Sequence, residues 1–275
     1  MIQRFLNKIW PYIFAKPWSI KLNTLLFNLS IRGLGILNYK SSYISGEESW
    51  LQKYLYDINN PIVFDVGANI GKYSEYVFSL MFYSNLYAFE PHPSNFRELQ
   101  NKFKAIKNNK GMFTTINSGV GDAPGSLELY DRKERDGSTH ASLYQGVIED
   151  MHHANSVHHT VDVITLDEFC ETNNINRIDL LKIDTEGNEL KCLMGARRLL
   201  ERNAIKAIQL EFNEMNIISH ATFKDFWDLL EGFSFARLLP GGNLMPIKTY
   251  SPLQCEIYAY QNIVAVLKLS LLNKE

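Results

Sequence analysis

The sequence predicts an α/β fold in which helices cover both faces of a mostly parallel sheet. From residue 62 onward, short apolar runs typical of buried strands alternate with segments of helical periodicity, as in strands joined by crossover helices. The first of these runs, residues 63–66, leads into an acidic turn punctuated by glycines, and the second ends in Glu90. Both features occur where doubly wound sheets bind adenosine-containing cofactors.

Residues 1–60 are expected to form a basic helical extension. Segments 2–10, 18–30 and 46–57 place apolar residues three and four positions apart, and prolines and glycines separate them. Residues 1–46 contain six basic residues and no acid, which leaves 22 basic and 30 acidic residues for the remainder. We expect these helices to pack on or near the cofactor side of the domain. Peripheral contact of this tryptophan-bearing extension with an anionic membrane is the alternative.

Residues 61–275 are expected to form one domain with seven strands. The predicted strands are 62–66, 86–90, 113–117, 178–184, 205–211, 233–239 and 255–267. Between the last two, Pro240 to Asn243 and Pro246 predict a loop and no crossover helix, so these two strands should form a hairpin at a sheet edge. Around residues 121–160 the alternation breaks, which indicates either a functional insertion or a solvated excursion.

The first turn indicates which kind of cofactor binds. Gly67, Asn69 and Gly71 follow a G-x-N-x-G pattern, and the glycine spacing of dinucleotide sites is absent. Asp65 precedes the first glycine by two residues, where a carboxylate would repel a pyrophosphate but attract a cation. S-adenosylmethionine carries a sulfonium and an ammonium group and fits this turn better than NAD does. The alternatives are an NAD-dependent oxidoreductase and a structural turn in which Asp65 only caps the helix.

Further cofactor contacts are predicted at the tips of the next strands. Glu90 ends the second strand, where these folds bind ribose hydroxyls, and Tyr73 opens the first helix. Asp122 follows the third strand, where an acid could meet the adenine amino group. It could equally begin a tight turn, because Asp-x-Pro-Gly is strong turn chemistry.

Asp184 and Glu186 are the predicted catalytic carboxylates. Both lie at the tip of the fourth parallel strand, beyond which the ligand crevice of an open sheet is found. A group there could accept the proton that an acceptor hydroxyl loses. The alternative is a Lys182–Asp184 ion pair beside a helix-capping acid. His140, in the insertion, is a rival base because its ordinary pKa is near 6.5.

No metal site is predicted, and the composition favours a reducing compartment. Adjacent histidines at 152–153 and 158–159 would point to opposite sides of an extended chain, although a divalent ion between Asp184, Glu186 and Glu211 stays open. Three scattered cysteines favour the cytoplasm, with the inner face of the cytoplasmic membrane as an alternative location. No membrane-spanning helix or signal peptide is expected. A net charge of −2 does not indicate a nucleic-acid partner.

Four segments in order resemble the FkbM-type class I S-adenosylmethionine-dependent methyltransferases: 65–71 (DVGANIG), 90–96 (EPHPSNF), 165–169 (TLDEF) and 181–189 (LKIDTEGNE). The resemblance spans about residues 45–267. It implies a Rossmann-like sheet with an antiparallel last strand, S-adenosylmethionine as the cofactor, and an insertion on the acceptor side. It also implies O-methylation of a saccharide or glycolipid acceptor, such as a cell-surface polysaccharide or a related natural product. A nitrogen or carboxylate acceptor is the alternative.

Overall fold

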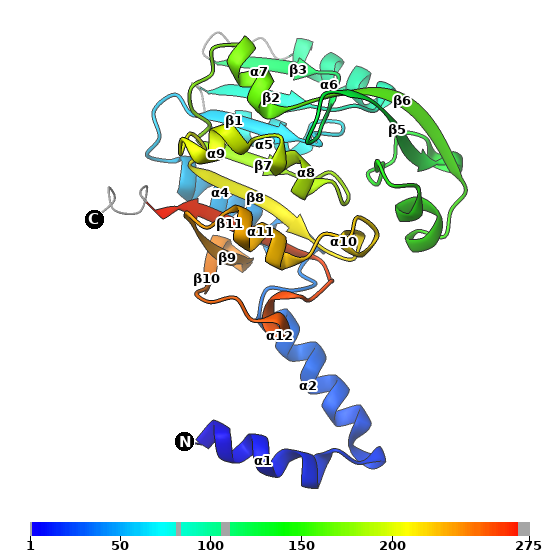
Figure 1. Ribbon diagram of the computed structural model, residues 1–275, viewed down its shortest axis with the longest axis vertical. Coiled ribbons are helices and arrows are strands. Elements are labelled where there is room, and N and C mark those ends of the chain that lie inside the picture. The colour runs from blue at the N-terminus through cyan, green and yellow to red at the C-terminus, as the bar shows by residue number, and fades with distance from the viewer. Residues whose placement is uncertain (1, 81–83, 106–110, 269–275) are drawn as a thin grey trace.

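The computed structural model describes residues 2–80, 84–105 and 111–268, and its centre is an eight-stranded mixed sheet (Figure 1). In spatial order the strands are β10 (Asn243–Ile247), β9 (Phe233–Leu239), β11 (Gln261–Leu267), β8 (Ala207–Phe212), β7 (Leu180–Ile183), β1 (Ile62–Val66), β2 (Asn85–Phe89) and β3 (Met112–Ile116). Strands β3, β2, β1, β7 and β8 are parallel, whereas β11 is antiparallel to both of its neighbours. The predicted doubly wound, Rossmann-like sheet is confirmed.

The direction of winding reverses between β1 and β7. The chain passes from β1 outward to β2 and β3, and then returns to place β7 on the other side of β1. At such a switch point the two neighbouring crossovers leave in opposite directions, which opens a crevice beyond the carboxyl ends of the strands. The topology therefore predicts a ligand site next to the ends of β1 and β7.

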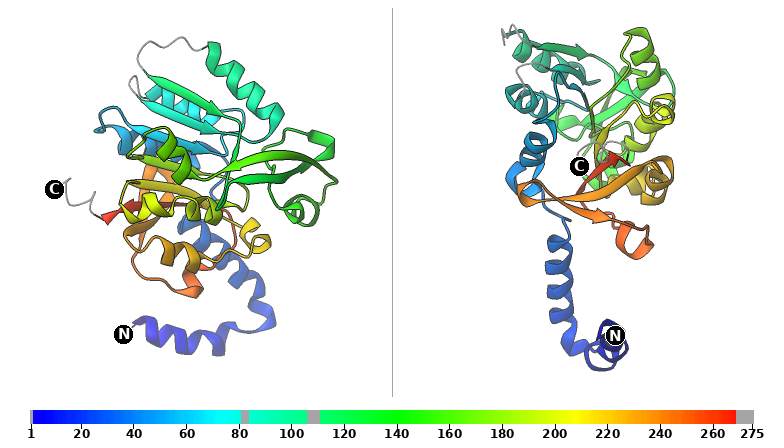
Figure 2. Two further views of the ribbon diagram at one scale, coloured as in Figure 1. Left: turned by 45° about the horizontal axis from the view of Figure 1, so that its top comes forward. Right: turned by 90° about the vertical axis from the view of Figure 1, so that its left-hand side faces the viewer.

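Two apolar cores cover the two faces of the sheet. Along β1, Val63 packs into one core and Phe64 into the other, because successive side chains of a strand point to opposite faces. The core around Val63 includes residues of α4 (Glu47–Leu55), α5 (Lys72–Leu80) and α6 (Pro93–Ala105). The other includes residues of α7 (Leu166–Thr172), α8 (Glu189–Met194), α9 (Arg197–Glu201) and α11 (Phe223–Leu229). Figure 2 shows the helices on both sides of the sheet.

A second, three-stranded sheet projects from the carboxyl edge of the first. It contains β4 (Gly119–Val120), β6 (Ser156–Ile164) and β5 (Gly125–Arg132), in that order, and β5 and β6 form a long antiparallel hairpin. The loop between them contains the short helices η2 (Lys133–Arg135) and η3 (Val147–Met151). The segment expected to interrupt the alternation, residues 121–160, thus contributes most of a separate hairpin beside the crevice (Figure 1).

The N-terminal segment has two parts that differ in their packing. Helices α1 (Ile2–Phe14), η1 (Pro17–Ser19) and α2 (Ile20–Gly33) extend away from the sheets, whereas α4 follows the short α3 (Ser42–Ser45) and buries Trp50, Leu51 and Leu55 in a core (Figures 1 and 2). No helix in the described ranges combines the length and the apolar character needed to cross a bilayer.

The C-terminal strands differ from the sequence prediction. Residues 243–247, predicted as a loop, form β10, so the sheet has eight strands where seven were predicted. Pro246 is compatible with this strand because β10 lies at the sheet edge, where a missing N–H breaks no ladder bond to a further strand. The last strand begins at Gln261 and not at residue 255, because α12 (Pro252–Cys255) occupies the first part of the predicted range. Its antiparallel direction is as predicted.

Gly67 generates a testable prediction about this fold. It has a φ of +81°, and a Cβ atom there would lie 1.8 Å from the backbone oxygen of Asp184 at the end of β7. We expect Gly67→Ala to lower the free energy of unfolding by more than about 2 kcal/mol, since the contacted atom is backbone and cannot rotate away. Urea unfolding measures the change.

Gly125→Ala is the matched control, because a Cβ atom at Gly125 would have no neighbour within 4 Å. Its free energy of unfolding should stay within about 0.5 kcal/mol of the unmodified protein. Equal stability of the two variants would contradict the proposed close approach of β1 and β7.

Candidate functional site

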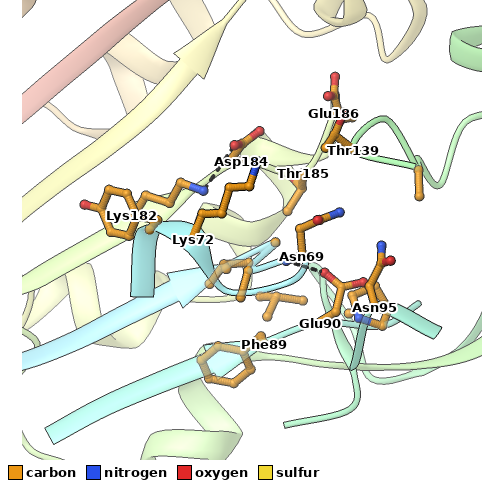
Figure 3. Close-up of a pocket in the computed structure, with 18 of the residues that line it drawn as sticks. Asn69, Lys72, Phe89, Glu90, Asn95, Thr139, Lys182, Asp184, Thr185 and Glu186 are labelled. Carbon is orange, nitrogen blue, oxygen red and sulfur yellow. Dashed lines mark hydrogen bonds and ion pairs between the residues drawn. The ribbon is translucent and has the colours of Figure 1, made fainter. Parts of the chain in front are cut away.

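A cavity of about 430 Å³ lies beyond the carboxyl ends of β1 and β7. Its volume is within the range of roughly 300–1,000 Å³ that is common for small-molecule and cofactor sites. Residues from α4, from the turns after β1, β2 and β7, from the end of β8 and from the loop between β5 and β6 line it. Figure 3 shows Glu90 and Asn95 at one end, Lys182 and Asp184 at the other, and Asn69 between them.

The turn after β1 brings its backbone into this cavity. Gly67 and Asn69 line the cavity, and both have positive φ angles, +81° and +50°. The Asn69 backbone N–H donates to Glu90 Oε2 at 2.7 Å, and its side-chain amide donates to the Ser138 carbonyl at 3.0 Å. Gly71 has a packing role: it is absent from the cavity lining, and a Cβ atom there would lie 2.5 Å from Leu99 Cδ1.

Asp65 lies behind the cavity and not in its wall. Its side chain is fully buried, accepts a 2.6 Å hydrogen bond from Ser74 Oγ, and lies 3.5 Å from Lys182 Nζ. The carboxylate that the sequence placed opposite the cofactor is therefore used inside the protein. It joins β1 to the start of α5 and to β7.

Two other predicted cofactor residues occupy different surroundings. Tyr73 lines the cavity, and its hydroxyl donates to Gln209 Oε1 at 3.1 Å; burial raises the pKa of this phenol well above its ordinary value. Asp122 is exposed in the turn between β4 and β5 and is not among the lining residues. Of the predicted cofactor set, Gly67, Asn69, Tyr73 and Glu90 thus line the cavity.

Glu90 is a buried carboxyl group held in one orientation. Its Oε2 accepts from the Asn69 backbone N–H and its Oε1 from the His92 backbone N–H, both at 2.7 Å. Burial raises the pKa of Glu90 to about 7, although these two hydrogen bonds act in the opposite direction. Each oxygen has a second lone pair, so an ionised Glu90 can accept hydrogen bonds from hydroxyl groups of a ligand.

Acidic side chains outnumber basic ones in the cavity wall. Six carboxyl groups line it, against two ammonium groups: Glu47, Glu48, Glu90, Asp184, Glu186 and Glu211, against Lys72 and Lys182. Burial and the nearby charges of Asp184 and Glu186 raise the pKa of Glu211 well above its ordinary value. A cationic ligand would relieve this repulsion, whereas a pyrophosphate would add to it.

Lys182 is a buried cation among the carboxyl groups of the cavity wall. Its ammonium group lies 3.1 Å from Asp184 Oδ2 and 3.5 Å from Asp65 Oδ1. Burial alone would lower the pKa of Lys182, but the charges of Asp184 and Asp65 outweigh burial and raise it, so the group stays protonated. The ion pair between Lys182 and Asp184, which the sequence left as an alternative to catalysis, is present in the structure.

His140 and Glu186 come together although 46 residues separate them in the chain. His140 Nδ1 lies 3.1 Å from Glu186 Oε1, and the His140 side chain is 38% exposed. Burial raises the pKa of Glu186 even though the His140 contact opposes this. Glu186 lines the cavity with a φ of +52°, an unusual backbone conformation for a non-glycine residue, whereas His140 lies just outside the lining.

The loop that carries His140 is held by a carboxylate that sequence reasoning missed. Asp131 is fully buried and accepts hydrogen bonds from the backbone N–H groups of Gly137 and Ser138, each at 2.8 Å, and from Ser138 Oγ at 2.5 Å. The Ser138 carbonyl in turn accepts from Asn69 and Asn95. This network connects the β5–β6 loop to the turn after β1, and Thr139 and Ala141 of that loop line the cavity.

Other lining residues also went unrecognised in the sequence. They include Glu47 on α4, residues 118–120 before and within β4, and Asn95 on α6. Glu47 accepts a 2.8 Å hydrogen bond from Gln209 on β8. A contact over 162 residues has no local signal, so only the tertiary structure identifies it.

One cluster has the composition of a metal site. In the part of the chain that the structure describes, only His92, Asp136 and His159 form a group whose potential ligand atoms all lie within 4.8 Å of one another. The Ser94 backbone N–H donates to His92 Nδ1 at 3.2 Å, so the ring proton of a neutral His92 lies on Nε2 and is donated to Asp136 at 2.9 Å. Hydrogen bonds alone therefore account for the contact between His92 and Asp136.

Comparison with known proteins agrees with this geometry. The family model described as "Methyltransferase FkbM domain" matches residues 65–235, more than half of the chain. The chain is similar to hexuronic acid methyltransferase AglP of Haloferax volcanii, with 24% identity over 160 residues that cover 58% of this chain and 59% of the relative. It is also similar to methyltransferase 1 of Beauveria bassiana, with 29% identity over 150 residues that cover 50% and 59% of the two chains.

The chain therefore spans about three-fifths of the length of these curated relatives, at 59% of each. Among solved structures it is similar to methyltransferase FkbM of Methylobacillus flagellatus. That match has 15% identity and a TM-score of 0.46, and it covers 79% of this chain and 47% of the other.

Glu189 generates a prediction about pH and stability. This buried residue begins α8, and its Oε1 accepts from the backbone N–H groups of Thr185 and Gly187 at 2.9 and 3.1 Å, which holds the tip of β7 in place. Burial raises the pKa of Glu189 to about 7, although the hydrogen bonds oppose this. From about pH 4.5 to 7 the folded protein retains a proton that the unfolded chain releases, so the free energy of unfolding falls as pH rises.

Glu189→Gln keeps the acceptor oxygen and removes this titration. We expect the decline in the free energy of unfolding between about pH 4.5 and 7 to become smaller by about 3 kcal/mol. Urea unfolding across this range measures it, with the exposed Glu201→Gln as the control. An unchanged pH dependence in Glu189→Gln would contradict the assignment.

Proposed function

This chain belongs to the FkbM methyltransferase family, and on that premise we propose that it is an O-methyltransferase acting on a hydroxyl of a saccharide or glycoconjugate. The observation that carries the proposal is the acid-lined cavity at the ends of β1 and β7, with the Glu186–His140 pair at its wall. The carboxyl groups of the cavity suit a cationic methyl donor. The Glu186–His140 pair suits removal of a proton from a neutral acceptor.

The methyl donor of this family is S-adenosylmethionine, which supplies an electrophilic methyl group on a sulfonium. The cavity suits a cationic group, because six carboxyl groups and two ammonium groups line its wall. Glu90 is the residue for the ribose hydroxyls, since both of its oxygens are oriented by backbone donors. Asn69 and Gly67 bring the backbone of the β1 turn beside it. The same negative charge disfavours an NAD-dependent oxidoreductase, because it repels pyrophosphate.

Glu186 is the proposed base. When S-adenosylmethionine is bound, the bond between its sulfonium sulfur and the methyl carbon would break as the acceptor oxygen bonds to that carbon, which would release S-adenosylhomocysteine. The acceptor hydroxyl would lose its proton to a group on the protein. Glu186 lines the cavity, and burial raises its pKa, which makes it a stronger base than an exposed carboxylate. The partly exposed His140 at 3.1 Å offers a path for the proton to solvent. Asp184 is held by Lys182 and is proposed to orient the reacting groups.

The saccharide acceptor rests on one relative and on the charge of the cavity. The Haloferax volcanii relative is named a hexuronic acid methyltransferase, and a hexuronic acid is a sugar that carries hydroxyls and a carboxylate. For this chain the hydroxyl is favoured, since a carboxylate acceptor would enter a wall in which carboxyl groups outnumber ammonium groups. Methylation of a carboxylate on the same class of sugar is the second candidate.

Two carboxyl substitutions should separate donor binding from proton removal. Glu186→Gln should lower kcat by about 10²- to 10⁴-fold, the usual contribution of a positioned base, and leave the affinity for S-adenosylhomocysteine unchanged. Glu90→Gln should weaken that affinity, because it removes the charge-assisted acceptor for the ribose hydroxyls. Calorimetry and steady-state rates measure the two effects, with the exposed Glu98→Gln as control. An undiminished kcat in Glu186→Gln would reassign the base.

The acceptor class is tested by transfer of labelled methyl groups from S-adenosylmethionine. The full chain is incubated with fractionated polysaccharides, lipid-linked saccharides, peptides and amines. We expect label in a saccharide fraction, and we expect it to survive mild alkali because an ether is stable where a methyl ester hydrolyses. Alkali-labile label would favour the carboxylate acceptor. Label confined to amines or peptides, or no label in any fraction, would contradict the proposed function.

A further inference from the structure

The N-terminal arm, residues 4–34, contains most of the exposed large apolar side chains in the part of the chain that the structure describes. Across the described ranges 21 large apolar side chains are exposed, and 13 of them lie in this arm. They are Phe5, Leu6, Trp10, Tyr12, Ile13, Trp18, Ile20, Leu22, Leu25, Leu26, Phe27, Leu29 and Leu34. Concentrated apolar surface of this kind marks an interaction site, since scattered single residues are the usual pattern on soluble proteins.

In α1 the large apolar residues gather on one face, and two basic residues lie beside it. Large apolar residues recur three and four positions apart on one face: Phe5, Leu6, Ile9, Trp10, Tyr12 and Ile13. Arg4 and Lys8 lie one turn apart at the edge of this face. Tyr12 is 82% exposed and Phe5 is 63% exposed, so the apolar face has no cover within the described chain.

The arm has a defined shape. At its corner Ser19 Oγ donates to the carbonyls of Phe14 and Lys16, and Asn23 Nδ2 donates to the Phe14 carbonyl at 2.8 Å. These bonds satisfy the end of α1 and fix its direction relative to α2. Where the arm joins the rest of the protein, the Leu37 backbone N–H donates to the Tyr260 carbonyl at 2.7 Å, and the neighbouring Ile36 is fully buried. Figure 1 shows α1 lying across the end of α2, away from the sheets.

Charge identifies what covers the arm. Residues 1–46 carry six basic residues and no acid, so two arms packed against each other would bring like charges together. An anionic lipid surface complements the same charges. Trp10, Tyr12 and Trp18 are exposed, and aromatic rings of this kind settle at the boundary between headgroups and acyl chains.

We propose that the N-terminal arm docks the protein on an anionic lipid bilayer, with α1 lying in the plane of the interface. A helix of 13 residues is only about 20 Å long, too short to cross a bilayer but sufficient to lie on one. The apolar face of α1 enters the headgroup region, and Arg4 and Lys8 contact lipid phosphates. This inference is independent of the acceptor, because docking involves no residue of the cavity wall.

Vesicle sedimentation of the full chain tests the inference. The probes are vesicles of phosphatidylcholine alone and of phosphatidylcholine mixed with phosphatidylglycerol. We expect the protein to sediment with the anionic vesicles. The double variant Trp10→Ser with Ile13→Ser should bind these vesicles about tenfold more weakly, or weaker still. Arg4→Gln with Lys8→Gln should reduce the preference for anionic vesicles, as should added salt. Leu253→Ser is the matched control, since Leu253 is 87% exposed but lies outside the arm.

Donor binding separates this test from that of the function. All variants should bind S-adenosylhomocysteine like the unmodified protein, which shows that they are folded. Equal recovery of the protein in the supernatant with both kinds of vesicle would overturn the inference. A second result would also overturn it: a dimer in solution that the double variant Trp10→Ser with Ile13→Ser converts to a monomer while lipid binding stays unchanged. A second copy of the chain would then be the partner of the arm.

Discussion

The buried ammonium group of Lys182 is the interaction on which the carboxyl edge of the sheet depends. It lies between Asp65 on β1 and Asp184 after β7, and 5.1 Å from the centre of the Tyr73 ring on α5. Without this cation, Ser74 would be the only polar partner of the fully buried Asp65 side chain among the described residues. Removing one partner of a buried pair leaves an uncompensated charge, which is far more costly than the loss of a surface ion pair. Lys182 thus joins three elements at the switch point where the cavity opens.

The carboxyl groups in and behind the cavity wall differ in their burial and in their hydrogen-bond partners. Asp65 is sealed behind the wall and serves the structure. Glu90 lines the cavity and accepts hydrogen bonds from two backbone N–H groups, whereas Glu186 is paired with a partly exposed histidine. Because burial raises the pKa of both Glu90 and Glu186, the protonation of the site changes closer to neutral pH than that of exposed acids. Residues of one chemical type therefore receive different roles from their surroundings.

Local patterns and long-range contacts explain why some sequence predictions were correct and others incomplete. The strand, turn and helix at residues 62–80 follow from an apolar run, two glycines and a helical period, and all of these are local. Pro246 predicted a loop because proline disrupts central strands, but the position of β10 at the sheet edge removes that conflict. Asp65 was expected to face the cofactor, since its spacing from Gly67 cannot reveal that Ser74 and Lys182 enclose it. The network from Asp131 through Ser138 to Asn69 had no local signal at all.

The sequence by itself determined the class of fold, the order of its parallel strands along the chain, the family, and the positions of the acids at the tips of β2 and β7. These features depend on periodicity and on motifs within short segments, which neighbouring residues define. Only the tertiary structure decided which of those acids reach the cavity, that His140 meets Glu186, and that α1 and α2 leave their apolar faces uncovered. Such outcomes depend on contacts between distant segments, and burial and pKa are properties of the assembled surroundings and not of the residue.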